Sequence, residues 1–359
     1  MKTVGVGRKV QLEDAGPILG SFPRQDSGGL WRPIRLKKRI LVLGTSQLAQ
    51  DLSRELAAQK RWVVEVVGFL DADTERVGER LVNPSILGTY DQLSQIVEAH
   101  KVDTIVVCLE DRRAVLPVKP LLEFKAMGLD IIDGHYLYEE ASGRLSIDSL
   151  RPSALIFSTG FRRRLTSVVL KRVFDVVASA VGLLVLLPLF CLVAVAIKVD
   201  SAGPVFYRQA RVGLRGRPYM IWKFRSMRQD AERHGPRWAQ ADDPRISRVG
   251  WWLRKTRLDE LPQLVNVLRG EMSLVGPRPE RPVFVQDLRV AIPYYDIRHT
   301  VRPGITGWAQ VKFRYGNSQE DSHKKLQYDL YYVKNLSMLL DLRVLVRTIR
   351  VILLGEGAY

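Results

Sequence analysis

The feature that most constrains this chain is an uncharged apolar run of 22 residues, Val176–Ile197, within 359 residues. At about 1.5 Å of rise per residue, a straight helix of that length reaches across the hydrocarbon core of a bilayer. Pro188 lies inside the run, where it removes a backbone hydrogen bond and is expected to break or bend the helix. So long an uninterrupted run favours a membrane segment over a soluble core helix.

Basic residues flank this run on both sides, and they bear on its topology. They are Arg162, Arg163, Arg164, Lys171 and Arg172 before it and Lys198, Arg208, Arg211, Arg215 and Arg217 after it. The positive-inside bias places both ends on the cytoplasmic side. We therefore expect a re-entrant helix with its membrane break at Pro188, and an ordinary spanning helix is the alternative.

Charge is distributed unevenly along the chain. Residues 1–150 hold 20 lysines and arginines against 21 aspartates and glutamates, whereas residues 151–359 hold 35 against 17. A basic half suits nucleic acid, anionic lipid headgroups or phosphorylated substrates. Because the apolar run lies in the same half and no nucleic-acid reader motif is present, we expect lipid and phosphate and no nucleic acid.

Cysteine and histidine usage argues against two further classes, disulfide-stabilised proteins and zinc proteins. The two cysteines, Cys108 and Cys191, both lie in apolar stretches. We therefore expect a reducing compartment and no disulfide framework. The five histidines have no metal-ligand spacing, which argues against zinc. Residues 1–37 mix glycine, proline and charge and read as a flexible leader without the apolar core of a signal peptide.

Residues 38–150 alternate apolar strands with amphipathic helices, a pattern that predicts a Rossmann-like α/β domain with a parallel sheet. Gly44 forms a turn after the first strand, and Asp71 follows the second strand. This pair resembles a dinucleotide-binding opening, but the full G-x-G-x-x-G pattern is absent. Two interpretations stay open. The region binds a nucleotide-like ligand at Gly44 and Asp71, or it is a purely structural or regulatory module.

An acidic pair, Asp259-Glu260, stands in a strongly basic neighbourhood. A helix is predicted over Leu261–Leu268 with Pro262 in its first turn, so both carboxylates would lie at a helix N-terminus. The helix dipole there favours the ionised form. Helix capping is the simpler interpretation, but the surrounding cations suit a diphosphate held with a divalent metal. These cations are Lys223, Arg254, Lys255, Arg257, Arg278 and Arg302.

The C-terminal segment Ser337–Leu354 is predicted to be a second membrane element. It is apolar except for Asp341, Arg343, Arg347 and Arg350 and some small polar residues, and the three arginines fall on one helical face. An amphipathic helix over 337–354, lying in the membrane interface, fits this pattern. A helix packed on the protein with a solvated stripe is the alternative.

Several long motifs of the basic half resemble the bacterial sugar transferases, the monotopic polyprenyl-phosphate phosphoglycosyl transferases. The resemblance covers about residues 168–359, and residues 38–150 are similar to the Rossmann-like domain of the long members. The motifs are Lys171–Asp175, the apolar run with Pro188, Gly203–Gly213, Trp222–Met227, Leu258–Gln263, Met272–Glu280 and Arg302–Gln310.

This resemblance implies transfer of a sugar 1-phosphate from a UDP-sugar to undecaprenyl phosphate, with release of UMP. It implies Mg²⁺ and a covalent intermediate on Asp259, with Glu260 as partner acid. The resemblance matches the family's substrate-binding Lys and Arg to Lys223, Arg254 and Arg278. Arg302 is expected to bind substrate phosphate as well, because of its position in a loop. Asp329 is matched to a later family aspartate and joins Asp259 and Glu260 as a metal ligand.

The expected organisation is therefore an α/β Rossmann-like domain (38–150), a connector (151–167) and an α+β membrane-associated catalytic domain (168–359). The expected location is the cytoplasmic face of a bacterial inner membrane, with exopolysaccharide synthesis as the setting. Long members usually have transmembrane helices ahead of the Rossmann-like domain, and none is present in this sequence. The alternative function is a non-catalytic regulator or scaffold of polysaccharide assembly, and a homo-oligomer stays open.

Overall fold

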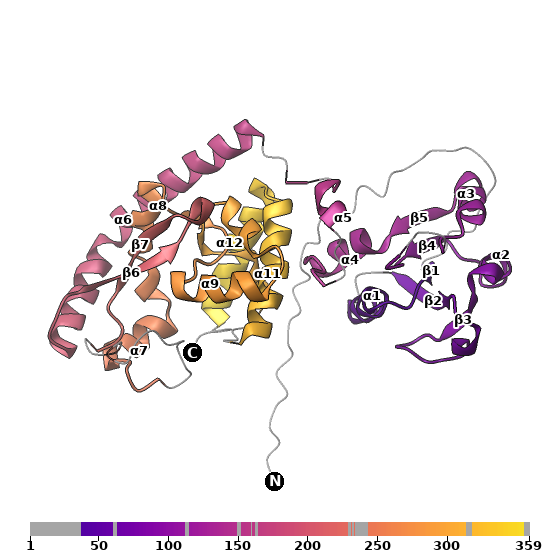
Figure 1. Cartoon of the computed structure of the whole chain (residues 1–359). Coiled ribbons are helices and arrows are strands. Elements are labelled where there is room, and N and C mark those ends of the chain that lie inside the picture. Colours follow the sequence, from indigo (N-terminus) through magenta and orange to yellow (C-terminus); the bar gives the residue numbers. More distant parts are fainter. Residues whose placement is uncertain are drawn as a thin grey trace, which may run out of the picture. The chain divides into compact units, whose positions relative to one another are not determined.

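A computed structural model describes residues 37–59, 63–111, 115–148, 152–158, 160–161, 164–228, 231, 233, 243–313 and 318–354. Residues 1–36 of the predicted leader, together with Arg162 and Arg163, lie outside the described residues. An α/β region begins at Lys38 and a second region begins at Leu165, and both are drawn in Figure 1.

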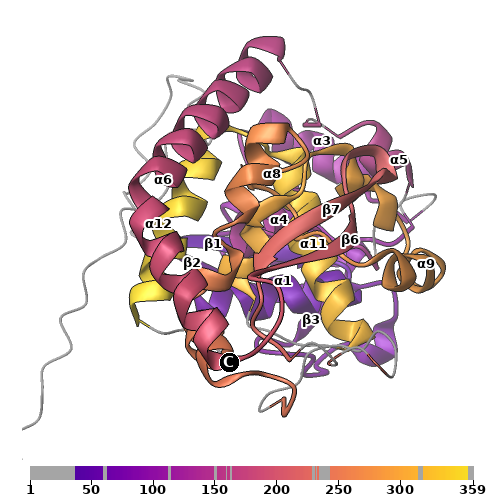
Figure 2. The ribbon, with the colours of Figure 1, turned by 90° about the vertical axis from the view of Figure 1, so that its left-hand side faces the viewer.

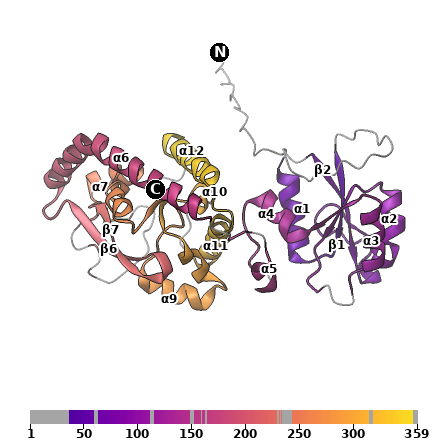
Figure 3. The same ribbon diagram turned by 90° about the horizontal axis from the view of Figure 1, so that it is seen from above.

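The α/β region contains a five-stranded parallel sheet in the order β3-β2-β1-β4-β5. Helices α1 and α4 cover one face of the sheet, and α2 and α3 cover the other (Figure 3). The predicted α/β fold is thus confirmed. The elements are β1 (Lys38–Leu43), α1 (Gln47–Ala58), β2 (Val64–Asp71), η1 (Thr74–Arg76), β3 (Ile86–Thr89), η2 (Tyr90–Gln92), α2 (Leu93–Ala99), β4 (Thr104–Val107), α3 (Val118–Ala126), β5 (Asp130–Asp133) and α4 (Gly134–Ser142).

Alternation along β1 explains how the sheet acquires two cores. Ile40 and Val42 pack in the cluster formed with α1 and α4, whereas Leu41 and Leu43 pack in the cluster formed with α2 and α3. All four side chains are at most 3% exposed. A strand buried on both faces needs a continuous apolar run, which is what the sequence provides.

The second region begins with α6 (Leu165–Asp200), a 36-residue helix that contains the apolar run. It is the one helix of the described chain that is long and apolar enough to cross a bilayer, and 11% of its most apolar window is buried by the protein. The helix is continuous through Pro188 (Figure 2), so the predicted interruption there is not seen. The same-side topology of its two ends stays a prediction.

Much of the rest of the second region packs around α11. Leu326 and Leu330 of this helix belong to one apolar cluster, and Tyr332 and Val333 belong to another. Strands β6 and β7 form an antiparallel pair, and β8 and β9 a parallel pair. The short helix α5 (Pro152–Ile156) precedes α6 in the sequence. The elements after α6 are β6 (Phe206–Val212), η3 (Leu214–Gly216), β7 (Pro218–Phe224), α7 (Arg248–Lys255), η4 (Leu258–Glu260), α8 (Gln263–Arg269), β8 (Ser273–Val275), α9 (Pro282–Ala291), η5 (Tyr295–Thr300), β9 (Gly304–Thr306), α10 (Trp308–Lys312), α11 (Gln319–Lys334) and α12 (Met338–Leu354).

Helix α12 confirms the predicted C-terminal helix, and one of its faces presents apolar side chains. The Lys171 ammonium of α6 donates to the buried Asp341 carboxylate of α12 at 2.6 Å, so an ion pair joins the two helices. Arg347 lies over the Trp308 ring, with 5.3 Å from its guanidinium carbon to the ring centre, and this contact fixes one of the three arginines against the protein. The exposed apolar side chains are Leu339, Leu342, Val346, Ile349 and Ile352.

Candidate active site

The acidic pair lies in a single 3₁₀ turn, η4, between α7 and α8. Arg257, which precedes the turn, has a left-handed backbone with φ of 60°, and α8 begins at Gln263 after Pro262. The pair is therefore separated from the helix whose N-terminus was predicted to hold it. Both Asp259 and Glu260 are 7% exposed, so two carboxylates are buried side by side.

Glu260 is held by two cations from different elements. Lys223 of β7 donates from Nζ to its Oε1 atom at 2.9 Å. Arg278, in the loop after β8, donates from Nη2 to the same oxygen at 2.7 Å and from Nη1 to Oε2 at 3.4 Å. Buried carboxylates are stable as ions when they are paired and hydrogen-bonded in this way.

Asp259 differs from its neighbour, because within the described chain no hydrogen bond or ion pair engages its carboxylate. The same cations still act on it through space, since the charges of Lys223, Arg254 and Arg278 all work to lower its pKa. Arg254 lies in the last turn of α7. The site therefore combines one carboxylate fixed by cations with one that forms no hydrogen bond or ion pair in the described chain.

Burial and charge separate the pKa values of the two acids. Burial is the largest influence on Asp259, and with the charge of Glu260 it raises the pKa to about 6 despite the three cations. Burial also acts to raise the pKa of Glu260, but Arg278 and Lys223 outweigh it and hold that pKa well below its usual range. The expectation that a helix dipole would set the ionisation of Asp259 is wrong, because burial and Glu260 dominate.

Asp329 lies on α11, where it forms a buried ion pair. Arg298 donates to its carboxylate at 2.8 Å, and these side chains are 7% and 2% exposed. Burial raises the pKa of Asp329 to about 6, against the opposing charge of Arg298. No recorded contact in the described residues joins Asp329 to Asp259 or Glu260, and no group of three or more His, Cys, Asp or Glu residues there could hold a metal.

Arg298 connects Asp329 to Arg278, the arginine that holds Glu260. The acidic pair Asp259-Glu260 is called the dyad below. Its Nη2 atom donates to the backbone carbonyl of Arg278 at 2.8 Å, and its Nη1 atom donates to the Tyr295 hydroxyl at 2.6 Å. Sequence reasoning missed Arg298, since one arginine among many in a basic half carries no distinguishing pattern. Its contacts make it a positioning residue for the Arg278 loop.

Two glycines let β8, which precedes the Arg278 loop, approach β9 closely. A Cβ atom on Gly276 would lie 2.4 Å from the Arg302 carbonyl oxygen, and one on Gly304 would lie 2.1 Å from the Gly276 nitrogen. Any side chain at either position would push β8 and β9 apart. Arg302 itself donates from Nε to the Gly270 carbonyl at 2.8 Å, and no recorded contact joins it to the dyad.

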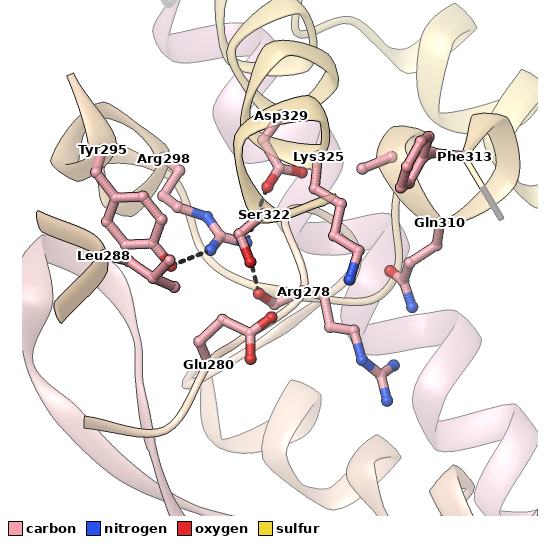
Figure 4. Close-up of a pocket in the computed structure, with 11 residues that line it drawn as sticks. Arg278, Glu280, Leu288, Tyr295, Arg298, Gln310, Phe313, Ser322, Lys325 and Asp329 are labelled. Atoms are coloured by element: carbon pink, nitrogen blue, oxygen red, sulfur yellow. Dashed lines mark hydrogen bonds and ion pairs between the residues drawn. The ribbon is translucent and has the colours of Figure 1, made fainter. Parts of the chain in front are cut away.

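A hollow adjoins Arg278, with about 490 Å³ of empty space including the part open to solvent. Figure 4 shows that Arg278, Lys325 and Gln310 lie along it, with the Tyr295 ring on one side and the Phe313 ring on the other. In the part of the chain that is described, the Oε1 atom of Gln310 is buried without a hydrogen-bond partner. A ligand that reaches Arg278 from this hollow meets both polar and aromatic groups.

At the second predicted site, in the α/β region, Asp71 is engaged by the protein's own side chains. The Asp71 carboxylate accepts hydrogen bonds from Thr45 Oγ1 and, at 2.7 Å, from Arg76 Nη1. Burial acts to raise the pKa of Asp71, but the Thr45 and Arg76 contacts outweigh it and lower the pKa. Gly44 has a φ of +100°, and a Cβ there would lie 2.9 Å from the Cys108 carbonyl oxygen.

Comparison with known proteins identifies related chains. The family model described as bacterial sugar transferase matches residues 166–355. A UDP-N-acetylgalactosamine-undecaprenyl-phosphate N-acetylgalactosaminephosphotransferase of Aeromonas hydrophila is 45% identical over 223 residues, 61% of this chain and 51% of the relative. An undecaprenyl-phosphate glucose phosphotransferase of Komagataeibacter xylinus is 33% identical over 335 residues, 90% and 61% of the two chains.

A third relative extends the likeness through the α/β region. The UDP-glucose:undecaprenyl-phosphate glucose-1-phosphate transferase of Escherichia coli (strain K12) is 32% identical over 330 residues, 90% of this chain and 69% of the relative. The chain thus spans about half to two-thirds of the length of these relatives. The matched residues include the dyad, Lys223 and Arg278 as well as all of α6 after its first residue. The chain belongs to the bacterial sugar transferase family.

Proposed function

We propose that this chain transfers a sugar 1-phosphate from a UDP-sugar to undecaprenyl phosphate and releases UMP. The reaction would take place at the cytoplasmic face of a bacterial inner membrane, with α6 in the bilayer, and would begin the synthesis of an exopolysaccharide or another surface glycan. The relatives' names support this class of reaction, since those proteins act on undecaprenyl phosphate with glucose or N-acetylgalactosamine.

The observation that carries the proposal is the unequal treatment of the two carboxylates. Glu260 is fixed by Lys223 and Arg278, whereas Asp259 has no recorded partner and lies within the influence of three cations. A nucleophilic carboxylate must be unengaged and ionised before it attacks. With a pKa of about 6, Asp259 is mostly ionised at neutral pH.

In the mechanism we propose, an Asp259 oxygen attacks the phosphorus that bears the sugar. The bond from that phosphorus to the bridging oxygen of the diphosphate breaks, UMP leaves, and an aspartyl phosphosugar remains. A phosphate oxygen of undecaprenyl phosphate then attacks the same phosphorus, which frees Asp259 as a carboxylate. Lys223, Arg254 and Arg278 stabilise the negative charge that collects on the phosphoryl oxygens in both steps.

Mg²⁺, if it takes part as the resemblance implies, fits the dyad better than a site built from three acids. The ion commonly binds through one or two carboxylates together with substrate phosphates and waters. Asp259 has an unengaged carboxylate for this, whereas Lys223 and Arg278 engage Glu260 beside it and Arg298 engages Asp329. When bound, the ion would neutralise charge on the diphosphate. Asp329 would then act through the Arg298 contact to the Arg278 loop.

The hollow beside Arg278 is our proposal for the part of the donor beyond the diphosphate. Its aromatic side chains, Tyr295 and Phe313, suit the face of a sugar or base, and Gln310 offers an acceptor to a hydroxyl or amide hydrogen. Gln310→Leu removes that acceptor while keeping similar volume. We expect it to raise KM for the donor several-fold with little change in kcat.

The test is UMP release by the full chain in detergent or nanodiscs, with undecaprenyl phosphate, Mg²⁺ and a panel of UDP-sugars. UDP-glucose and UDP-N-acetylgalactosamine should be compared first. Release that depends on both the lipid and one UDP-sugar supports the proposal. A folded chain that releases no UMP from any donor would favour the alternative, a non-catalytic member of a polysaccharide assembly machine.

A further inference from the structure

A second cavity lies at the start of α6, and it is lined by a different set of cations from those around the dyad. It has about 750 Å³ of empty space including the part open to solvent. Four basic side chains line it, and Asp175 is the one carboxylate among its lining residues. The basic side chains are Lys171, Arg172, Arg215 and Arg302.

Two of these cations each make two contacts within the protein. The Lys171 ammonium pairs with Asp341 and also donates to the Val275 carbonyl at 3.1 Å. The Arg172 guanidinium donates from both terminal nitrogens to carbonyls at the end of α8, at 2.6 and 2.9 Å. Asp175 is also engaged, because its Oδ1 atom accepts the Leu274 N–H at 3.1 Å.

The other two cations, Arg302 and Arg215, have donor groups without a recorded partner in the described chain. Arg302 uses only Nε, which donates to the Gly270 carbonyl, and its two terminal nitrogens have no recorded partner among the described residues. Arg215 is exposed and, in the same part of the chain, forms no recorded hydrogen bond or ion pair. The terminal nitrogens of an arginine form a planar fork that matches the oxygens of a phosphate.

Two further features indicate that the cavity is a built site. The Ser273 hydroxyl lines it, is 1% exposed as a residue, and has no hydrogen-bond partner in the described chain. A buried hydroxyl without a partner is unfavourable unless a ligand or water pairs with it. Arg215 also has a left-handed backbone with φ of 57°, and such strain in a non-glycine residue is concentrated at ligand sites.

The cavity is placed where membrane headgroups would lie. Val168, Lys171, Arg172 and Asp175 form one face of α6 immediately before the uncharged run begins at Val176. Another lining residue, Leu336, lies two residues before α12, which has exposed apolar side chains. The cavity thus lies near the start of α6 and of α12, and both of these helices present apolar surface. Cations at that depth face the phosphates of the leaflet.

We propose that this cavity binds the phosphate of an anionic phospholipid, which anchors the start of α6 and is separate from the reactive lipid at Asp259. Arg302 and Arg215 donate to the phosphate oxygens, and the Ser273 hydroxyl donates a further hydrogen bond. The acyl chains follow the apolar faces of α6 and α12 into the bilayer. Arg302, expected from the sequence to hold substrate phosphate, is assigned to this second site.

The experiment measures thermal unfolding of the full chain in an uncharged detergent, with added phosphatidylglycerol or phosphatidylcholine at equal mole fraction. For the wild type we expect phosphatidylglycerol to raise Tm by about 2–5 °C and phosphatidylcholine to leave it unchanged. Arg215→Gln and Arg302→Gln should lose at least half of that rise. Arg217→Gln is the matched control, because this exposed arginine lies in the same turn but outside the cavity.

Three outcomes would overturn the proposal. An equal loss of the rise in Arg215→Gln and Arg217→Gln would indicate diffuse charge attraction. An equal rise with inorganic phosphate would assign the cavity to a soluble anion. A rise with undecaprenyl phosphate and none with phosphatidylglycerol would assign it to the acceptor. Arg215 is exposed and its side chain has no recorded contact, so its variant should fold even where Arg302→Gln, which loses the Gly270 contact, does not.

Discussion

The α/β region and the region that begins at α6 bury very different side chains. In the described part of the α/β region, the buried side chains are mostly aliphatic, and the buried charged residues are Asp71 and Glu139. The second region buries many more charged groups at less than 9% exposure. They include Asp175, Arg225, Asp243, Asp259, Glu260, Arg298, Asp329 and Asp341.

This difference separates the part that needs only to fold from the part that must also do chemistry. Burying a charge is expensive, and a buried ion pair is often no more stable than apolar residues of the same size. Several buried charges of the second region hold backbone in place. Arg225, for example, donates to the carbonyls of Ala202 and Ser201 at the end of α6. We interpret Glu260, Arg298 and Asp329 as the means of fixing Lys223 and Arg278 beside Asp259.

The largest effect is expected from a change to Asp259, the buried carboxylate that has no recorded partner in the described chain. Asp259→Asn keeps the shape of the side chain but removes the nucleophilic charge. We expect UMP release to fall by at least about three orders of magnitude. Since Asp259 has no recorded partner, Tm should stay within a few degrees of the wild type or rise. Turnover near the wild-type rate would refute the assignment of the nucleophile.

Glu260→Gln is the contrasting variant for this experiment. It leaves Lys223 and Arg278 without the carboxylate that pairs them, so both stability and activity should fall. A variant pair in which Asp259→Asn destabilises more than Glu260→Gln would reverse the roles proposed for the two acids.

The second prediction concerns the buried pair behind the dyad. Asp329→Asn leaves the Arg298 charge buried without its partner, which should cost about 3–5 kcal/mol. Unfolding can be followed through the fluorescence of Trp222 and Trp308, which lie in the same region. Asp71→Asn in the α/β region is the control, because its partner Arg76 is 35% exposed and the loss should be smaller. Equal losses in the two variants would remove the distinction between the regions.

The sequence predicted the α/β region through patterns that act over short distances. Runs such as Arg39–Leu43 alternate between two cores, and these local patterns predict strands and helices well. Strand β3 was missed because Ile86–Thr89 is short, contains a glycine and follows Pro84. Helix α4 was missed as well, although Asp133 caps it through hydrogen bonds to two backbone N–H groups.

The site of the second region could be predicted only in part. Lys223, Glu260 and Arg278 were singled out by their motifs, but no pattern within the sequence shows that two cations from distant segments meet one carboxylate. Arg302 and Asp329 were grouped with them on the same motifs, and the structure gives each a different neighbourhood. Burial decides the ionisation of Asp259, and burial depends on tertiary packing that helix position alone does not reveal.

The third prediction uses the raised pKa of Asp259, about 6, as a readout of its burial. The carboxylate attacks only when ionised, so kcat/KM should fall as pH decreases through 6. About nine-tenths of the free enzyme is active at pH 7 and about one-tenth at pH 5. Arg254→Gln removes a cation that lowers this pKa, so the acidic limb should move to higher pH. A rate constant that is flat from pH 5 to 8 would contradict an ionising Asp259.

The smallest expected effect on catalysis comes from removing the α/β region. All residues assigned to the dyad and its cations lie after residue 164, so chains beginning at Phe161 or at Gly143 should both release UMP within about threefold of the full chain.

The stabilities of these two chains should differ. Leu145 and Ile147 are 4% and 2% exposed and pack in the apolar cluster around Leu326, so the shorter chain loses two core side chains. At about 1.5–3 kcal/mol for each buried aliphatic side chain, its Tm should be lower by several degrees. If both chains fold in membranes and neither releases UMP, the α/β region contributes to catalysis and the separation of the two regions is wrong.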